Sequence, residues 1–284
     1  MDTAQYEKLS TGNHVNDNIK IKAILLGGVD VLKAIIGGTG VYGIGKSNRK
    51  LVETTYGKVE LDIIYIGGEE IVFLSRHGKD HTVPPHRINY RANMLALKNI
   101  GVEYIYSTAA VGSCNENYTP GDVVIIKDFL DFTKARPTTF FEGGEEKVKH
   151  VDMSDPYCKN LREKFYGVAK KYDIDIKGDA VYVCTEGPRF ETANEIHMFK
   201  HLGGDVVGMT NVPEVVLAKE LGICYATVGI ISNWCTGMKE EITLHDIQKE
   251  LDKNKEKITK AFIEIFKGDL DKDNCNCKNS IIEL

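Results

Sequence analysis

The residues best suited to chemistry follow apolar runs of the chain, at the points where those runs end in polar side chains. Arg76 and His77 come directly after the run 71–75, and Asn233 comes soon after the run 224–231. Arginine and histidine together suit recognition of an oxyanion, since both donate directed hydrogen bonds to oxygen. An asparagine amide donates and accepts at once, which suits a heterocycle edge with one acceptor nitrogen and one carbonyl. A solvated turn at 76–77 and a turn-capping role for Asn233 are the alternatives.

Two further strand ends carry polar residues, and they organise the rest of the chain. Residues 181–185 are apolar and β-branched, and the run stops at the turn sequence Glu-Gly-Pro-Arg of 186–189. Residues 205–210 form a second short strand, followed by a helix with Pro213 and Glu214 in its first turn. Because α/β proteins place ligands at strand ends, we expect these two ends to face one site.

A glycine-rich turn at 37–43 contains a G-x-G-x-x-G pattern. A dinucleotide fingerprint would open a helix that packs on the sheet, but residues 44–50 are polar and have no apolar face. The glycines still allow backbone N–H groups to approach an anion, and Thr39 adds a hydroxyl donor. The turn is therefore predicted to cradle a phosphate.

The composition indicates a globular chain that acts on a small molecule. The chain has 284 residues, of which 42% are hydrophobic and 27% charged, and its formal net charge is −5. This charge gives no basic face for a nucleic acid, and no apolar run is long enough to cross a bilayer. No signal peptide is visible, so we expect a cytoplasmic protein whose seven cysteines are reduced.

The elements that must position these residues are predicted as alternating strands and helices. Strands are expected at 31–36, 58–66, 71–75, 104–113, 121–126, 181–185, 205–210 and 224–231. Helices are expected at 86–100, 159–171, 192–201 and 213–221 and from 243 onward, and a long loop at 128–155. We expect residues 1–32 to be an N-terminal extension, disordered or translated from a start codon assigned too early. Residues 33–268 would form one domain, and residues 269–284 a tail with a Cys-x-Cys sequence.

Taken in order, these segments resemble one protein family. The turn at 37–43, Arg76-His77, and the segments 108–113, 185–190, 209–220 and 232–233 are similar to the methylthioadenosine phosphorylase branch of the trimeric purine nucleoside phosphorylases. The resemblance covers about 34–267. It implies an α/β fold, a single domain with a mixed central β-sheet flanked by helices. It also implies reversible phosphorolysis of a purine nucleoside to free base and ribose 1-phosphate, with inorganic phosphate as co-substrate and without a metal or other cofactor.

The resemblance also implies roles for individual residues. His77 and Asn233 would be the catalytic residues, and His150 would reach across a subunit boundary of a homotrimer, or of a dimer of trimers, to close the neighbour's sugar pocket. Glu191 and Leu244 would influence specificity. The phosphate site would consist of Thr39, Arg76, His77, the backbone of Ala109 and Ala110, and Thr210. The nucleoside would contact Met209, Phe190, His150, Asn233, Trp234 and Cys235.

The base-reading segment departs from the methylthioadenosine enzymes, which carry Asp-Tyr-Asp where this chain has Asn233-Trp234-Cys235. An amide can donate to N7 and to a 6-oxo group, so the segment favours 6-oxopurine nucleosides such as inosine and guanosine, in purine salvage. Leu244 would accept an apolar 5′-methylthio group, which keeps methylthioinosine and methylthioadenosine open as alternatives. A nucleoside- or phosphate-binding protein without enzymatic activity is a further alternative. Cys275 and Cys277 could bind a metal or form a redox-active disulfide.

Overall fold

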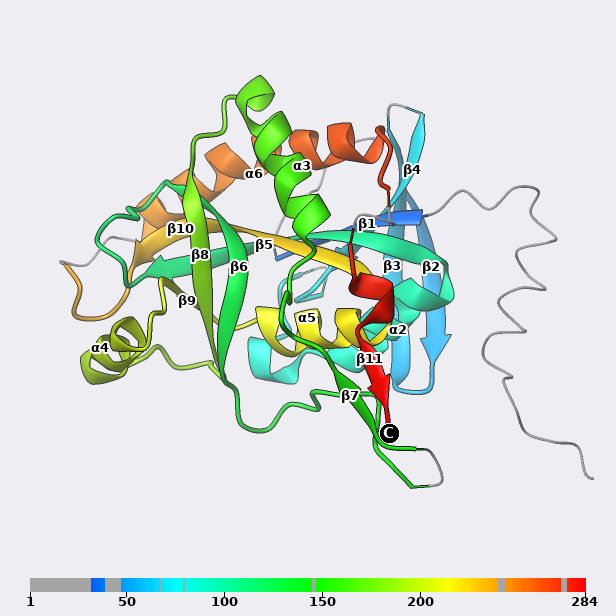
Figure 1. Cartoon of the computed structure of the whole chain (residues 1–284). Helices are drawn as coiled ribbons and strands as arrows, with labels where there is room; N and C mark the ends of the chain where they lie inside the picture. Colours follow the sequence, from blue (N-terminus) through cyan, green and yellow to red (C-terminus); the bar gives the residue numbers. More distant parts are fainter. Residues whose placement is uncertain are drawn as a thin grey trace, which may run out of the picture. The chain divides into compact units, whose positions relative to one another are not determined.

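A mixed β-sheet forms the centre of the protein (Figure 1). The computed structural model describes residues 32–38, 47–66, 68–78, 80–144, 147–239, 244–271 and 275–284, and at 47, 244–251 and 253 it describes the backbone alone. Nine described strands make up this sheet, in the order β10-β6-β8-β9-β5-β1-β4-β3-β2. They are β1 (Leu32–Gly37), β2 (Ser47–Thr54), β3 (Gly57–Ile66), β4 (Glu69–Ser75), β5 (Val102–Ser113), β6 (Val123–Phe132), β8 (Ile176–Thr185), β9 (Val206–Gly208) and β10 (Cys224–Trp234).

Helices cover both faces of the sheet, and each face has its own apolar core. On one face lie α2 (Tyr90–Asn99) and α5 (Asn211–Glu220), and on the other α3 (Lys159–Ala169) and α6 (Leu244–Phe266), as Figure 1 shows. In α6 the buried residues Ile258, Phe262 and Ile265 recur at helical spacing, as the apolar stripe of the sequence predicts. Helix α4 (Ala193–His201) packs with β8 and β9 in a third, smaller cluster. Short 3₁₀ turns occur at η1 (Pro85–Arg87), η2 (Lys170–Tyr172) and η4 (Cys277–Asn279).

Strand β5 lies at the centre of the candidate site described below. Along one edge it pairs in parallel with β10 over nearly its whole length, from Tyr104 to Ser113. Along its other edge the partner changes, since β1 pairs with residues 102–107 and β9 with Gly112 and Ser113. No described strand pairs with this second edge at 108–111. The backbone groups there can therefore face a ligand rather than a neighbouring strand.

The end of the chain forms a second, small sheet. Strand β11 (Ile281–Glu283) pairs antiparallel with β7 (Lys149–Val151), and Ile282 lies opposite His150. Residues 32–284 form one compact unit that includes this tail. The expected extension at 1–32 falls outside the described residues except for Leu32, and the domain boundaries stay predictions.

The predicted fold class is confirmed, because the structure is a mixed sheet flanked by helices. Two local predictions are wrong. The loop expected at 128–155 is shorter, since β6 continues to Phe132 through its pairing with β8 and β7 begins at Lys149. The helix expected from residue 86 begins at Tyr90, because the Asn89 side chain accepts from Ala92 N–H and caps it. Strand β2 was not predicted, since its residues are mostly polar and exposed.

None of the helices that the structure describes is both long enough and apolar enough to span a lipid bilayer.

Candidate active site

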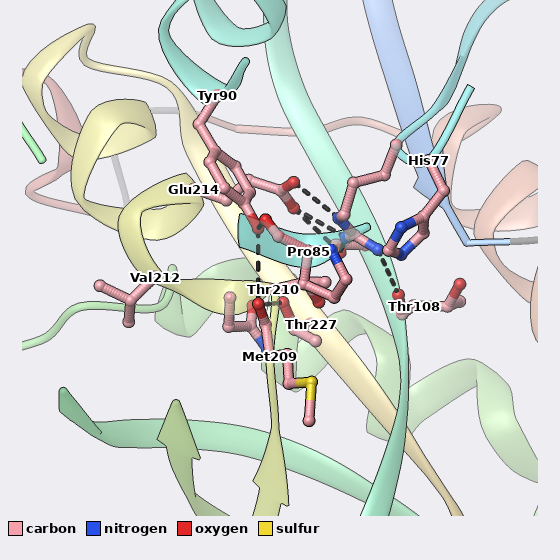
Figure 2. Close-up of polar contacts among 12 residues, drawn as sticks. His77, Pro85, Tyr90, Thr108, Met209, Thr210, Val212, Glu214 and Thr227 are labelled. Carbon is pink, nitrogen blue, oxygen red and sulfur yellow. Dashed lines mark hydrogen bonds and ion pairs between the residues drawn. The ribbon is translucent and has the colours of Figure 1, made fainter. Parts of the chain in front are cut away.

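A buried ion pair joins the end of β4 to the start of α5. The Arg76 guanidinium donates from Nε and Nη2 to the two oxygens of Glu214, both at 2.8 Å, and the two side chains are almost fully buried (Figure 2). Nη2 also donates to Ser107 Oγ, and Nη1 donates to Thr108 O at 3.2 Å. Burial works to lower the pKa of Arg76, but the Glu214 carboxylate outweighs it and raises this pKa above its ordinary value. Among these contacts one Nη1 hydrogen is left for a ligand.

His77 is held next to this pair in a defined tautomer. Its Nδ1 lies 2.8 Å from Val83 O, and since a carbonyl only accepts, Nδ1 carries the hydrogen. Burial, together with the neighbouring charge of Arg76, lowers the pKa of His77 to about 4. The imidazole is therefore neutral near pH 7, and its Nε2 lone pair is an acceptor.

The unpaired edge of β5 lies beside these two residues. Arg76 contacts Thr108 O, and a Cβ added to Gly37 would lie 3.9 Å from Thr108 Oγ1. A Cβ on Gly38 would likewise lie 3.9 Å from the His77 ring. The end of β1, the end of β4 and the middle of β5 thus converge. Ala109 and Ala110 follow Thr108 on this strand, whereas Thr39 lies outside the described residues.

Thr210 and Met209 approach the same place from β9. Thr210 precedes α5, is almost buried, and donates its backbone N–H to Tyr182 Oη at 3.2 Å. Met209 packs so closely on the turn after β8 that a Cβ at Gly187 would lie 2.5 Å from its sulfur. Gly187 also has a φ of +68°, which disfavours other residues. The two predicted strand ends, after β8 and after β9, therefore do meet.

The residues predicted to read the base lie further along β5, near the end of β10. Asn233 pairs with Gly112, accepts from Ser232 Oγ at 2.7 Å and donates from Nδ2 to Trp234 O at 2.8 Å. Cys235 is buried beside them, and Trp234 is partly exposed with Lys239 Nζ 4.2 Å from its ring centroid. One Nδ2 hydrogen of Asn233 and a lone pair of its Oδ1 remain beyond these contacts.

The two groups of residues are spaced for one ligand with two ends. Thr108, beside the oxyanion donors, and Gly112, beside Asn233, are four positions apart on β5, which corresponds to about 13 Å.

The remaining residues predicted for the site are not part of the two groups described above. Glu191 accepts from Thr185 Oγ1 at 2.6 Å, and so belongs to the turn after β8. Phe190 is 75% exposed in the single chain. His150 is exposed on β7, in the small sheet with β11, and not on the edge of the main sheet. The side chain of Leu244 lies outside what the structure describes, so its proposed contact with the 5′ substituent stays a prediction.

Three residues of the site were not singled out from the sequence. The sequence indicates Glu214 only as a helix-start residue, because its ion-pair partner Arg76 lies 138 positions away. Thr108 was seen only as part of a motif. Arg136 gave no signal, yet it is buried and donates to Val212 O at 2.7 Å, Thr185 O at 3.1 Å and Glu186 O at 2.8 Å. It thereby connects the turn after β8 to the start of α5.

Comparison with known proteins identifies the family. A sequence profile of the family described as the phosphorylase superfamily matches residues 33–267. The chain belongs to the phosphorylase superfamily. The family resemblance predicted from the sequence is thereby confirmed.

Relatives within the superfamily carry several substrate names. A Dictyoglomus turgidum protein named probable 6-oxopurine nucleoside phosphorylase is 49% identical over 254 residues, covering 88% of this chain and 96% of the relative. A Methanopyrus kandleri protein named probable S-methyl-5′-thioinosine phosphorylase is 51% identical over 207 residues, covering 72% and 80%. Among solved structures, a methylthioadenosine phosphorylase from an antarctic soil metagenomic library has a TM-score of 0.81 and 34% identity, covering 87% of this chain and 90% of that one.

Proposed function

We propose that this member of the phosphorylase superfamily catalyses the reversible phosphorolysis of 6-oxopurine nucleosides, with inosine and guanosine as the main substrates. The observation that carries the proposal is the placement of Asn233 beside Gly112, four strand positions or about 13 Å along β5 from Thr108, which Arg76 contacts. The 49% identity to a protein named for 6-oxopurine nucleosides supports it. The enzyme would act in purine salvage in the cytoplasm.

In this reaction a phosphate oxygen bonds to C1′ as the C1′–N9 bond breaks, and the bond's electron pair leaves with the base. The sugar becomes oxocarbenium-like, which the adjacent phosphate anion stabilises, while the amide of Asn233 donates toward N7 of the departing base. Arg76, Thr39, Thr210 and the backbone of Ala109 and Ala110 would hold the phosphate. Neutral His77 would accept a hydrogen bond at Nε2 from the hydroxyl of monohydrogen phosphate.

The other contacts would orient the nucleoside. Met209 and Phe190 would lie against the sugar and base, and Trp234 and Cys235 would border the base with Asn233. Glu191 and Leu244 would set specificity. His150 would come from a neighbouring chain of a homotrimer, or of a dimer of trimers, so that the oligomer completes the site. Phosphate is a co-substrate, and this chemistry needs no cofactor.

A second candidate is phosphorolysis of S-methyl-5′-thioinosine, or of S-methyl-5′-thioadenosine. The 51% identity to a protein named for methylthioinosine favours it, as does the apolar residue type at Leu244.

The proposal is tested by initial rates of phosphate-dependent base release from inosine, guanosine, adenosine, methylthioinosine and methylthioadenosine. Faster cleavage of 6-oxopurines supports the role of Asn233, and the ratio of methylthioinosine to inosine decides between the two candidates. The variant Asn233→Asp should shift preference toward 6-aminopurines, because a carboxylate repels a 6-carbonyl and accepts from a 6-amine. The exposed Asn117→Asp is the matched control. Dominant cleavage of methylthioadenosine by the wild type would contradict the proposal.

A further inference from the structure

Four cysteines from three distant parts of the chain meet at one point. Cys158 precedes α3, Cys224 begins β10, and Cys275 and Cys277 lie in the C-terminal tail. Their Sγ atoms all lie within 4.8 Å of one another, and Cys224 Sγ is 3.4 Å from Cys275 Sγ. Cys158, Cys224 and Cys277 are buried, and Cys275 is half-buried. The other three cysteines, Cys114, Cys184 and Cys235, lie elsewhere in the structure.

This arrangement matches the geometry of a tetrahedral metal site. With Zn–S bonds of about 2.3 Å, tetrahedral thiolates lie about 3.8 Å apart, within the range seen here. A disulfide would need two sulfurs at about 2.05 Å, and the 3.4 Å between Cys224 and Cys275 exceeds this. We propose that Cys158, Cys224, Cys275 and Cys277 form a site for one structural Zn²⁺ ion.

The ligand set and its surroundings favour zinc in a structural role. Four thiolates fill the tetrahedral positions of Zn²⁺, which leaves none for water or substrate. Binding releases the four thiol protons to solvent and leaves a net charge of −2 at the site. Lys219 is almost fully buried, interacts electrostatically with Cys277, and donates from Nζ to Asp155 O at 2.7 Å. Its positive charge compensates part of the negative charge.

The proposed zinc site is remote from the candidate active site and would fasten the tail. Cys224 and Asn233 are at opposite ends of β10, nine positions or about 30 Å apart. Next to Cys277, Ser280 Oγ donates to Lys219 O at 2.9 Å, and the tail then continues into β11. The ion would connect this tail to α3 and β10. It would stabilise the fold and take no part in phosphorolysis.

Metal analysis of the full-length protein, purified without added metal or chelator, tests the proposal. We expect about one zinc ion per chain in the wild type and in Cys114→Ser, a matched control outside the cluster. Cys275→Ser should lose the ion, whereas Cys275→His should retain it, because imidazole can replace one thiolate. Chelation should lower the melting temperature of the wild type, and added Zn²⁺ should restore it. Substitution with Co²⁺ should give thiolate-to-metal charge-transfer absorption and the visible bands of a tetrahedral ion.

Three outcomes would overturn the assignment. One is a zinc content that is the same in Cys275→Ser as in the wild type. Another is a stoichiometric metal other than zinc. The third comes from thiol titration of the chelated, denatured chain without reductant, in which a zinc site predicts that all seven cysteines react. Only three would react if the cluster were two disulfides. Cys275 is the half-buried member, so its substitution is the least disruptive test of the set.

Discussion

At the scale of single residues, the proposed phosphate ligand Arg76 is already bound to a carboxylate. The Glu214 carboxylate fixes the guanidinium through two hydrogen bonds, and Tyr225 Oη donates to the same carboxylate at 2.6 Å. The pair is neutral overall, so the phosphate would be held by directed donors more than by net positive charge. Because the donors are already oriented, they need little reorganisation when the bond to the base breaks.

Replacing Glu214 with glutamine should destabilise the protein strongly. Arg76 would keep its charge in a buried place without the compensating carboxylate charge, which typically costs about 3 kcal/mol or more of the free energy of unfolding. Urea unfolding measures this loss. The control is Glu256→Gln, in which both the carboxylate and its partner Lys260 are exposed, and little or no loss of stability is expected there. Similar losses in both variants would contradict a structural role for the buried pair.

The lowered pKa of His77 predicts a pH dependence of stability. The folded chain holds the His77 proton only below about pH 4, whereas an unfolded histidine binds it below about pH 6.5. Between pH 4 and pH 6.5 the unfolded state therefore binds more protons than the folded state. The contribution of His77 to stability is present above pH 6.5 and is lost as the pH falls toward 4. The loss should reach about 3 kcal/mol.

Urea unfolding of the wild type and of His77→Asn at pH 7 and pH 4 checks this. The wild type should lose more stability than the variant on acidification. His81, whose ring centroid lies 4.4 Å from that of His77, is kept in both chains. An equal loss in the two proteins would mean that His77 is charged in the folded state.

At the scale of elements, the proposed base site depends on close contact between β5 and the end of β10. A Cβ at Gly112 would lie 2.8 Å from Cys235 Sγ and 3.3 Å from Asn233 Nδ2. Gly112→Ala should therefore displace both residues, at a cost of about 1–3 kcal/mol in stability. The KM for nucleoside should rise much more than the KM for phosphate, measured by steady-state kinetics. Adding Cys235→Ala should restore part of the stability, and no recovery would contradict the contact.

Many of the strand ends and helix starts could be predicted because the local sequence determines them. Polar residues after β4 and β8 marked those strand ends, and Pro213 with Glu214 marked the start of α5, whereas β10 continues past its predicted end at 231 to Trp234. What escaped prediction depends on partners far along the chain. The end of β6 exists because β8 pairs with it, and Arg136 matters only because three distant carbonyls surround it. The proximity of Cys158 and Cys277 likewise depends on the fold and not on the local sequence.

At the scale of the whole molecule, the proposed role of His150 belongs to an assembly. His150 lies on β7, in the small sheet, and the main-sheet site residues lie elsewhere in the chain. If it serves a neighbouring chain, His150→Ala and Arg76→Lys should each be weakly active alone and should complement each other. Lysine keeps the charge of Arg76 but loses its two-pronged contact.

Unfolding and refolding the two variants together as a mixture tests this. Random assembly should leave about one site in four with both intact residues, so activity should rise well above the mean of the separate variants. Each variant refolded alone is the control. Activity no higher than that mean would place the function of His150 within its own chain, or nowhere in the reaction.

The pairing of β11 with β7 also has a practical consequence for handling the protein. The backbone N–H of the last residue, Leu284, donates to Val148 O at 3.1 Å, two positions before His150. Anything fused after Leu284 would start beside the strand that carries this histidine. If His150 closes a nucleoside site, an affinity tag placed after Leu284 should weaken nucleoside binding in assays intended to measure it. Purification and immobilisation should therefore use a tag placed away from β11.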